Sequence, residues 1–202
     1  MGVLIPAHRE DLDVRDATFA VPDLTTFARL DELGLVVVGQ RVEPDRTVLA
    51  CRVVATDADG WCRRCGCEGR VRDSVVRVLA HEPFGWTATT LQVTVRRYRC
   101  TGCGHVWRQD MSAAAEPRAR LSRRGLRWAL EGLVCQHLTV ARIAEALSVS
   151  WTTANDAVLA EGKRVLIADP TRFDQVTTLG VDDSPARFAP SGRYPQRVAA
   201  HP

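Results

Sequence analysis

Two Cys-x-x-Cys-Gly motifs constrain the fold of this chain of 202 residues more than any other feature. The first is CRRCG at Cys62–Gly66 and the second is CTGCG at Cys100–Gly104. Two thiolates separated by two residues can bind one tetrahedral metal ion from a tight turn. The glycine that follows permits a left-handed backbone, which directs amide groups at the sulfur atoms. The sequence therefore predicts a structural zinc site with four ligands, Cys62, Cys65, Cys100 and Cys103.

Other uses of the cysteines fit the sequence less well. Disulfide bonds belong to oxidising compartments, and the N-terminus carries no secretory signal. A redox Cys-x-x-Cys needs only one pair, near a βαβ pattern. Cys67 and His105 could replace neighbouring ligands, but each lies beyond its turn glycine. Cys51 and Cys135 lie in apolar runs, which predicts buried and inert thiols.

Strand patterns surround the two cysteine pairs. Residues 35–54 read as a β-hairpin, and residues 71–79 and 87–100 read as two further strands. From Leu91 to Val95 apolar and polar residues alternate, so one face of this sheet is expected to be apolar. Because four thiolates leave no open coordination position, the zinc is expected to stabilise a small domain rather than to catalyse a reaction.

A helical period begins at Ser122, and residues 138–169 have the layout of a helix-turn-helix. Thr139 and Ser150 can each cap a helix with apolar positions on one face. A recognition helix presents its N-terminal residues to base edges in the DNA major groove. In the second helix those residues are Trp151, Thr152, Thr153 and Asn155. An ordinary αα corner has the same spacing and is the alternative interpretation.

The net charge of +3 hides a basic central segment. Residues 51–128 contain 15 arginines and 7 acidic residues, a net charge of +8. Five arginines precede or begin the first predicted helix, and they are Arg118, Arg120, Arg123, Arg124 and Arg127. Arginines in such a cluster can neutralise DNA phosphates and hold a protein on the duplex without reading its sequence. A solvated basic face is the alternative.

The chain resembles a known family in four stretches: CRRCGCEGRVRD, HEPFGWTATTLQVTVRRYRCTGCGHVWRQD, the segment from LSRRGLRW to LIADP, and LGVDD. They are similar to insertion-sequence transposases of the ISL-three type, and together they span about residues 35–183. The resemblance implies a zinc ribbon, a helix-turn-helix that binds terminal inverted repeats of double-stranded DNA, and a DDE catalytic domain of ribonuclease H-like fold. It also implies that Asp182 corresponds to the first catalytic carboxylate.

The C-terminus departs from that family. Only 20 residues follow Asp182, and after Asp183 they contain no acidic residue. Two-metal phosphoryl transfer needs several carboxylates. We therefore expect a truncated transposase in which Asp182 is vestigial and which is inactive as an enzyme by itself; Mg²⁺ would serve only a full-length relative. An incomplete record of an intact enzyme is the alternative explanation for the short C-terminus.

The predicted fold class is α+β, with a small β-rich zinc ribbon followed by an all-α helix-turn-helix domain. A truncated first strand of a ribonuclease H-like domain and an irregular tail would follow. The expected segments are an N-terminal hairpin segment, the zinc ribbon, a basic linker, the helix-turn-helix domain and the catalytic remnant, at residues 1–50, 51–110, 111–121, 122–170 and 171–202.

Partners and location follow from the same features. The expected partner is double-stranded DNA, with a homo-oligomer also allowed. The longest apolar run, Leu33–Gly39, is far too short to span a bilayer, so a cytoplasmic location is expected. The alternative function is a zinc-ribbon and helix-turn-helix transcription regulator that was never an enzyme.

Overall fold

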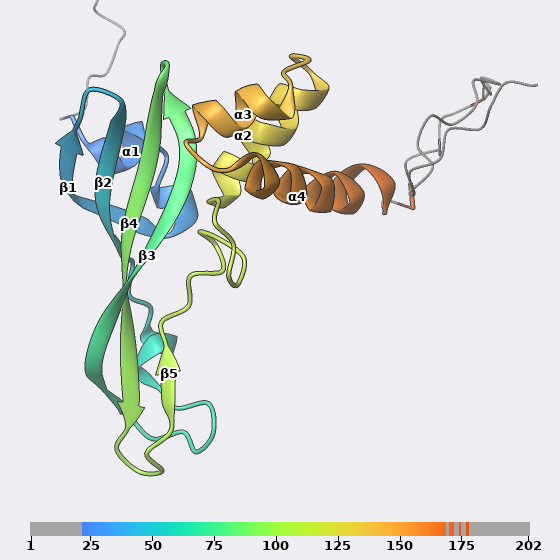
Figure 1. The fold of residues 1–202 in the computed structure, drawn as a ribbon. Helices are drawn as coiled ribbons and strands as arrows, with labels where there is room; N and C mark the ends of the chain where they lie inside the picture. The colour runs from blue at the N-terminus through green and yellow to red at the C-terminus, as the bar shows by residue number, and fades with distance from the viewer. Residues whose placement is uncertain (1–21, 169, 172–173, 175–176, 178–202) are drawn as a thin grey trace, which may run out of the picture.

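The structure is a computed structural model that describes residues 22–168, 170, 171, 174 and 177. This part of the chain is α+β, with a mixed sheet on one side and helices on the other (Figure 1). The sheet has five strands, namely β1 (Leu35–Val42), β2 (Arg46–Val53), β3 (Gly69–Phe84), β4 (Thr87–Cys100) and β5 (Val106–Arg108). The predicted α+β class is therefore confirmed. Asp182 and most of residues 171–202 lie outside the described residues.

The long β3–β4 hairpin connects two differently built ends of the sheet (Figure 1). At the upper end in that view, β2 pairs with β4 in parallel, from Arg46 opposite Ala88 to Arg52 opposite Thr94. At the lower end, the short strand β5 pairs with β4 instead. The predicted hairpin is present as β1 and β2, and β2 runs continuously across the expected segment boundary between residues 50 and 51.

A hydrophobic core supports only the upper end of the sheet. Alternate residues of β4 are buried, including Leu91, Val93 and Val95, as their period-two pattern predicts. The short helices α1 (Leu24–Phe27) and η2 (Asp31–Leu33) cover this face, together with Ala28 and Leu30 from the segment between them. Zinc is therefore not the only means by which the β-rich part can fold.

The segment expected to be a basic linker is packed against the sheet. Ala114 and Ala115 are buried in the sheet core. Farther along, the N–H of Ala80 donates to Arg120 O at 2.8 Å, and the N–H of Ser122 donates to Ala80 O at 2.9 Å. These contacts join the sheet to the helices.

Three helices form a second core beside strand β3. They are α2 (Arg123–Val134), α3 (Val140–Ala146) and α4 (Trp151–Gly162), and α4 continues as the π-helical segment η4 (Lys163–Ile167). The serine or threonine before each helix accepts a hydrogen bond from its first turn, as the sequence predicts for Thr139 and Ser150. No helix in the described part of the chain is long and apolar enough to cross a membrane.

One expectation about the end of α2 was wrong. Cys135, predicted to be a buried thiol, is exposed, and its neighbour Val134 is 44% exposed. Cys135 is the C-terminal cap of α2, and its N–H bonds the carbonyl of Glu131. The apolar period therefore continues past the point at which neighbouring helices still cover α2.

Candidate metal centre and nucleic-acid interface

The four predicted cysteines meet at the lower end of the sheet. The Sγ atoms of Cys62, Cys65, Cys100 and Cys103 all lie within 4.8 Å of one another. Cys65 lies 3.3 Å from Cys100 and 3.4 Å from Cys103, and Cys62 lies 3.7 Å from Cys103. The four thiols could therefore bind a metal ion such as zinc.

The backbone of each turn explains how the cysteines converge. Gly66 and Gly104 have φ of 72° and 69°, the left-handed conformation that glycine adopts without a steric penalty. In the first turn, the N–H of Gly66 donates to Cys62 O at 2.8 Å. In the second, the N–H of Cys100 donates to His105 O at 2.8 Å. The β3–β4 pairing then brings the two turns together, since Gly69 lies opposite Cys100.

The cluster has the size that zinc requires. Zn–S bonds of about 2.3 Å in a tetrahedron place the sulfur atoms about 3.8 Å apart. The shortest Sγ–Sγ distances, 3.3 to 3.7 Å, are close to that value. A site of four cysteines is closed, so a bound metal would link the two turns and leave no open position for a substrate.

The surroundings favour a thiolate at Cys100. Its Sγ accepts the N–H groups of Gly102 and Cys103, each at 3.3 Å. The N–H of Cys103, assisted by the Cys65 thiol, lowers the pKa of Cys100 to about 6 although burial opposes this. A lower pKa favours the deprotonated form that a metal ion binds.

The remaining cysteines lie outside the cluster. Within the described residues, neither Cys67 nor His105 belongs to the group that could hold a metal ion. Cys51 is fully buried in the sheet core, and burial raises the pKa of its thiol to about 11. The prediction that Cys51 is buried is confirmed.

The metal centre is supported by His105 and by three residues that the sequence analysis did not single out, Tyr98, Trp107 and Asp59. Trp107 of β5 stacks on Tyr98 at a centroid distance of 5.7 Å and on His105 at 6.1 Å. Its indole N–H donates to Asp59 O at 2.9 Å, which connects β5 to η3 (Asp57–Gly60). The sequence signal for this support was the presence of two aromatic side chains, His105 and Trp107, next to the second cysteine pair.

The predicted recognition residues lie at the start of α4 with different exposures. Trp151 and Thr152 are exposed, whereas Thr153 and Asn155 are half-buried. Thr153 bonds Ser150 through both its hydroxyl group and its backbone N–H. A hollow of about 300 Å³ separates this end of α4 from the sheet and is lined by Ser150, Thr153, Val78 and Arg120, among others. The sheet therefore lies beside the N-terminus of α4.

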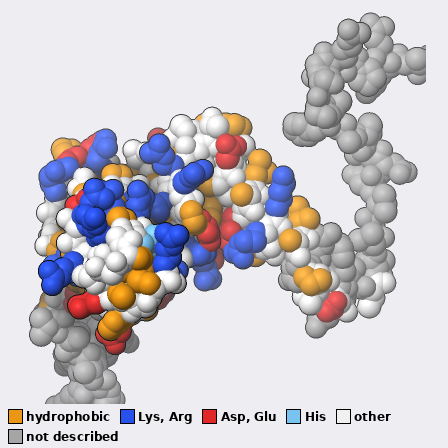
Figure 2. Space-filling view, turned by 90° about the horizontal axis from the view of Figure 1, so that it is seen from below, with side chains coloured by type: hydrophobic (Ala, Val, Ile, Leu, Met, Phe, Trp, Pro, Cys, Tyr) orange, Lys and Arg blue, Asp and Glu red, His pale blue; other side chains and the backbone are white. Residues whose placement is uncertain are grey.

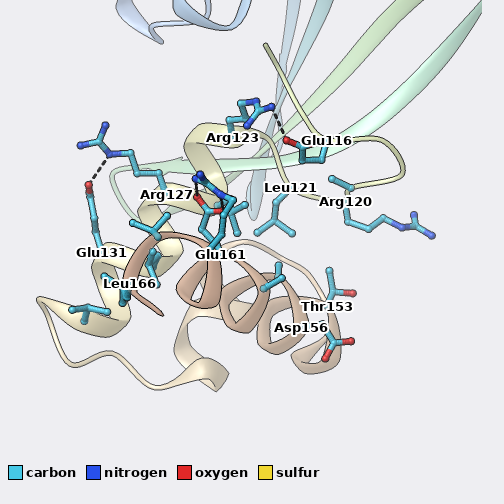
Figure 3. Close-up of a pocket in the computed structure, with 18 of the residues that line it drawn as sticks. Glu116, Arg120, Leu121, Arg123, Arg127, Glu131, Thr153, Asp156, Glu161 and Leu166 are labelled. Carbon is cyan, nitrogen blue, oxygen red and sulfur yellow. Dashed lines mark hydrogen bonds and ion pairs between the residues drawn. The ribbon is translucent and has the colours of Figure 1, made fainter. Parts of the chain in front are cut away.

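Three of the predicted phosphate-binding arginines are already paired with acidic side chains. Arg123 bonds Glu116 at 2.6 Å, and Arg127 bonds Glu131 at 2.7 Å (Figure 3). Arg124 bonds both Glu82, at 2.6 Å, and Glu32, at 2.9 Å. Arg118 and Arg120 are exposed, and neither makes an ion pair within residues 22–168.

Two of the paired arginines, Arg123 and Arg127, line a groove of about 1020 Å³ between α2, α4 and η4 (Figure 3). Its charged lining residues balance: Arg120, Arg123, Arg127 and Arg164 against Glu116, Glu131, Asp156 and Glu161. Apolar side chains such as Leu126, Leu130 and Leu166 line the rest. This balance makes the groove a poor site for a phosphate chain.

Comparisons with protein families, with curated proteins and with solved structures find no match to this chain.

Proposed function

We propose that this chain is a DNA-binding protein whose structural zinc ion is held by Cys62, Cys65, Cys100 and Cys103, and that it is the DNA-binding portion of an insertion-sequence transposase. The zinc connects the two cysteine turns and keeps the lower end of the sheet folded. Thiolate-rich clusters of this size suit zinc well, because the thiolate is a preferred ligand and the site is closed.

The observation that carries the proposal is the arrangement of α3 and α4. A short turn, Leu147–Ser150, joins the two helices, and Ser148 in it has a φ of 51°. Ile143 and Leu147 are buried on one side of the turn, and Ala154 and Val158 on the other. This packing supports a helix-turn-helix in which α4 is the recognition helix.

The charges near α4 support the same proposal and change the expected role of individual arginines. Arg120 lines the hollow beside the N-terminus of α4 and has no acidic partner within residues 22–168. Arg118 precedes it by two residues. These two arginines are the best phosphate contacts, because Arg123, Arg124 and Arg127 would each have to leave a glutamate to bind DNA.

Base reading is assigned to residues in the first turns of α4, of which Trp151 and Thr152 are exposed and Asn155 is half-buried. Thr152 is exposed, and the amide of Asn155 makes only a weak contact of 3.4 Å with Asp156. An asparagine side chain can pair with adenine in the major groove. Trp151, 55% exposed, can contact the DNA from the helix start. Thr153 is assigned a role in capping α4.

The test is selection of preferred duplexes from a random-sequence DNA library by the zinc-loaded chain. Asn155→Ala should weaken binding to the selected duplex by about 1–3 kcal/mol and leave binding to unselected duplex unchanged. Gln136→Ala is the matched control, since it removes an exposed amide from the same group of helices. No enrichment by the wild-type chain, or an unchanged preference in Asn155→Ala, would contradict the assignment.

A further inference from the structure

A second groove in this chain is strongly positive, unlike the neutral groove beside α4. It has a volume of about 770 Å³ and lies between the lower end of the sheet and residues 110–118. Four arginines line it, Arg63, Arg77, Arg108 and Arg118, and among the residues that the structure describes its only acidic lining residue is Asp110. Viewed from below, arginine side chains gather over this end of the molecule (Figure 2).

Arg77 forms the floor of the groove and has no acidic partner among residues 22–168. Its guanidinium group donates to Ala119 O at 2.8 Å and to Glu116 O at 3.2 Å. Burial and the nearby charge of Arg108 lower the pKa of Arg77. A partly buried cation that faces a like charge raises the electrostatic potential of the groove and favours a bound anion.

Arg63, Arg108 and Arg118 are exposed around this floor, and none of them makes an ion pair within residues 22–168. Asp110 offsets only part of their charge. Its carboxylate accepts the N–H of Ser112 at 2.9 Å, and this contact, with the charge of Arg63, lowers the pKa of Asp110. Three accessible arginines therefore remain available to an anionic ligand.

The backbone at Arg118 holds that side chain at the groove. Arg118 has a φ of 63°, a conformation that long side chains seldom adopt. The turn around it is closed by the N–H of Ala119, which donates to Glu116 O at 3.1 Å. Arg77 holds the turn in place, because its guanidinium group donates to the carbonyl oxygens of both Glu116 and Ala119. The linker thus presents Arg118 on one side, and Arg120, two residues later, beside α4.

We propose that this positive groove, lined by Arg63, Arg108 and Arg118 over Arg77, binds the phosphodiester backbone of duplex DNA. The inference rests on the proposed function and adds a second contact to it. Arg118 and Arg120 are at most about 7 Å apart along the chain. One DNA strand can therefore pass from the α4 end of the linker to the zinc end of the sheet. Such contacts hold the protein on DNA without reading bases.

The test uses the full zinc-loaded chain with the double substitution Arg108→Thr and Arg118→Asn. Asparagine tolerates the left-handed backbone, and threonine suits a strand, so both positions keep their conformations. The matched control is Arg29→Asn with Arg52→Thr. It removes the same charge from a residue with φ of 49° and from an exposed strand position of β2, both outside the groove.

Binding to a selected duplex and to a random duplex is measured over a range of salt concentrations. The groove variant should weaken both by the same factor and reduce the slope of log affinity against log salt by about 2, one unit for each lost phosphate contact. The control variant should behave as wild type. If the groove variant keeps the wild-type affinity and slope while Asn155→Ala loses its preference, the groove inference is wrong and the proposed function stands.

A further measurement separates failure of the two ideas. If the wild-type chain binds no duplex at all, the proposed function and the DNA assignment of the groove both fail. Heat stabilisation by inorganic tripolyphosphate, lost in the groove variant and kept in the control, would then show a phosphate site that serves another ligand. Loss of sequence preference in the groove variant, without loss of random-duplex affinity, would also contradict a backbone contact.

Discussion

The two ends of the β3–β4 hairpin are stabilised by different physical means. At the upper end, β1, β2, α1 and η2 bury leucine and valine side chains against the hairpin. The fully buried residues there include Leu30, Leu49 and Leu91. Burial of a side chain of this kind stabilises a fold by about 1.5–3 kcal/mol.

At the lower end almost no aliphatic side chain is available for burial. Val71 of β3 is 54% exposed and Val106 of β5 is 37% exposed. The structure there depends on the four thiols, the stacked rings of Tyr98 and Trp107, and the ion pair between Arg97 and Asp73.

The difference shows how one hairpin can be long without a long core. Where helices and a second hairpin cover the sheet, apolar burial is sufficient. Beyond them, the four cysteines of the two turns, the stacked rings and the Arg97–Asp73 ion pair take the place of a hydrophobic core, and a metal ion could join the two turns. The positive surface lies on the lower end of the sheet (Figure 2). Because no apolar elements cover this end, arginine side chains there are exposed and accessible to a ligand.

The largest expected effect is selective unfolding of the lower end when the metal is removed. Chelation, or Cys100→Ser, should abolish zinc binding and amide protection in β5 and in the turns at Cys62–Gly66 and Cys100–Gly104. Structural zinc contributes on the order of 10 kcal/mol to such sites. Amide hydrogen exchange should show that residues 88–95 of β4 stay protected, because the hydrophobic core holds them.

Cys67→Ser is the control, because Cys67 neighbours the site but lies outside the four-cysteine group. It should retain one zinc ion per chain. Equal loss of protection at both ends after chelation would show that the upper core cannot stand alone. Unchanged amide protection at the lower end after chelation would show that the metal does not stabilise that end.

The second expected effect is at the other end of the hairpin. Leu91→Ala should lower the free energy of unfolding by about 2–5 kcal/mol, because it leaves a cavity in the sheet core. Zinc stoichiometry should stay unchanged. Val78→Ala on the same sheet removes a side chain that is 55% exposed and should have a much smaller effect. Denaturant unfolding of the zinc-loaded proteins measures both, and equal losses would contradict the assigned core.

The local parts of this architecture could be predicted from the sequence because they depend on neighbouring residues. The alternation from Leu91 to Val95 determines which face of β4 is buried. Thr139 and Ser150 cap helices through bonds that span three residues. The sequence predicts that the two cysteine pairs form one site, because a tetrahedral metal site needs four ligands and each pair supplies two.

The remaining features depend on contacts between distant parts of the chain. Parallel pairing of β2 with β4 and burial of Ala114 and Ala115 follow from tertiary packing, which no local pattern encodes. One partner of Arg124, Glu32, lies 92 residues away in the sequence. An arginine that the sequence predicts to contact DNA can therefore be paired with a carboxylate within the fold. In the same way, a segment predicted to be a linker can be part of the core.

The third expected effect concerns His81, where the sheet meets the helices. Its ring is fully buried, and Nδ1 lies 2.8 Å from the hydroxyl group of Ser122, the cap of α2. Burial, assisted by the charge of Arg124, lowers the pKa of His81 to about 4 from an ordinary value of 6.5. The unfolded chain therefore binds a proton at higher pH than the folded chain does.

Stability from this residue should be complete above pH 6.5 and decline as the pH falls toward 4. The slope contributed by one proton is about 1.4 kcal/mol per pH unit. His81→Gln, which cannot titrate, should flatten the pH dependence of the unfolding free energy in that window. An equally steep pH dependence of the unfolding free energy in the variant would assign the effect to carboxylates instead of His81.

The smallest expected effect compares two arginines of α2 and tests whether surface ion pairs contribute to either end. Arg124 connects α2 to Glu82 of β3, whose side chain is 19% exposed, so Arg124→Ala leaves a partly buried carboxylate without its partner. We expect a loss of about 1 kcal/mol in the free energy of unfolding, because desolvated groups that lose a partner are costly but Glu82 keeps some contact with solvent.

Arg127 pairs with Glu131 one turn away, and both side chains are mostly exposed. Arg127→Ala should leave the denaturation midpoint unchanged, because water and side-chain entropy cancel most of the gain from such a pair. A larger loss in Arg127→Ala than in Arg124→Ala would mean that α2 is held by its solvent-facing side, and that the junction to the sheet matters less than its buried contacts indicate.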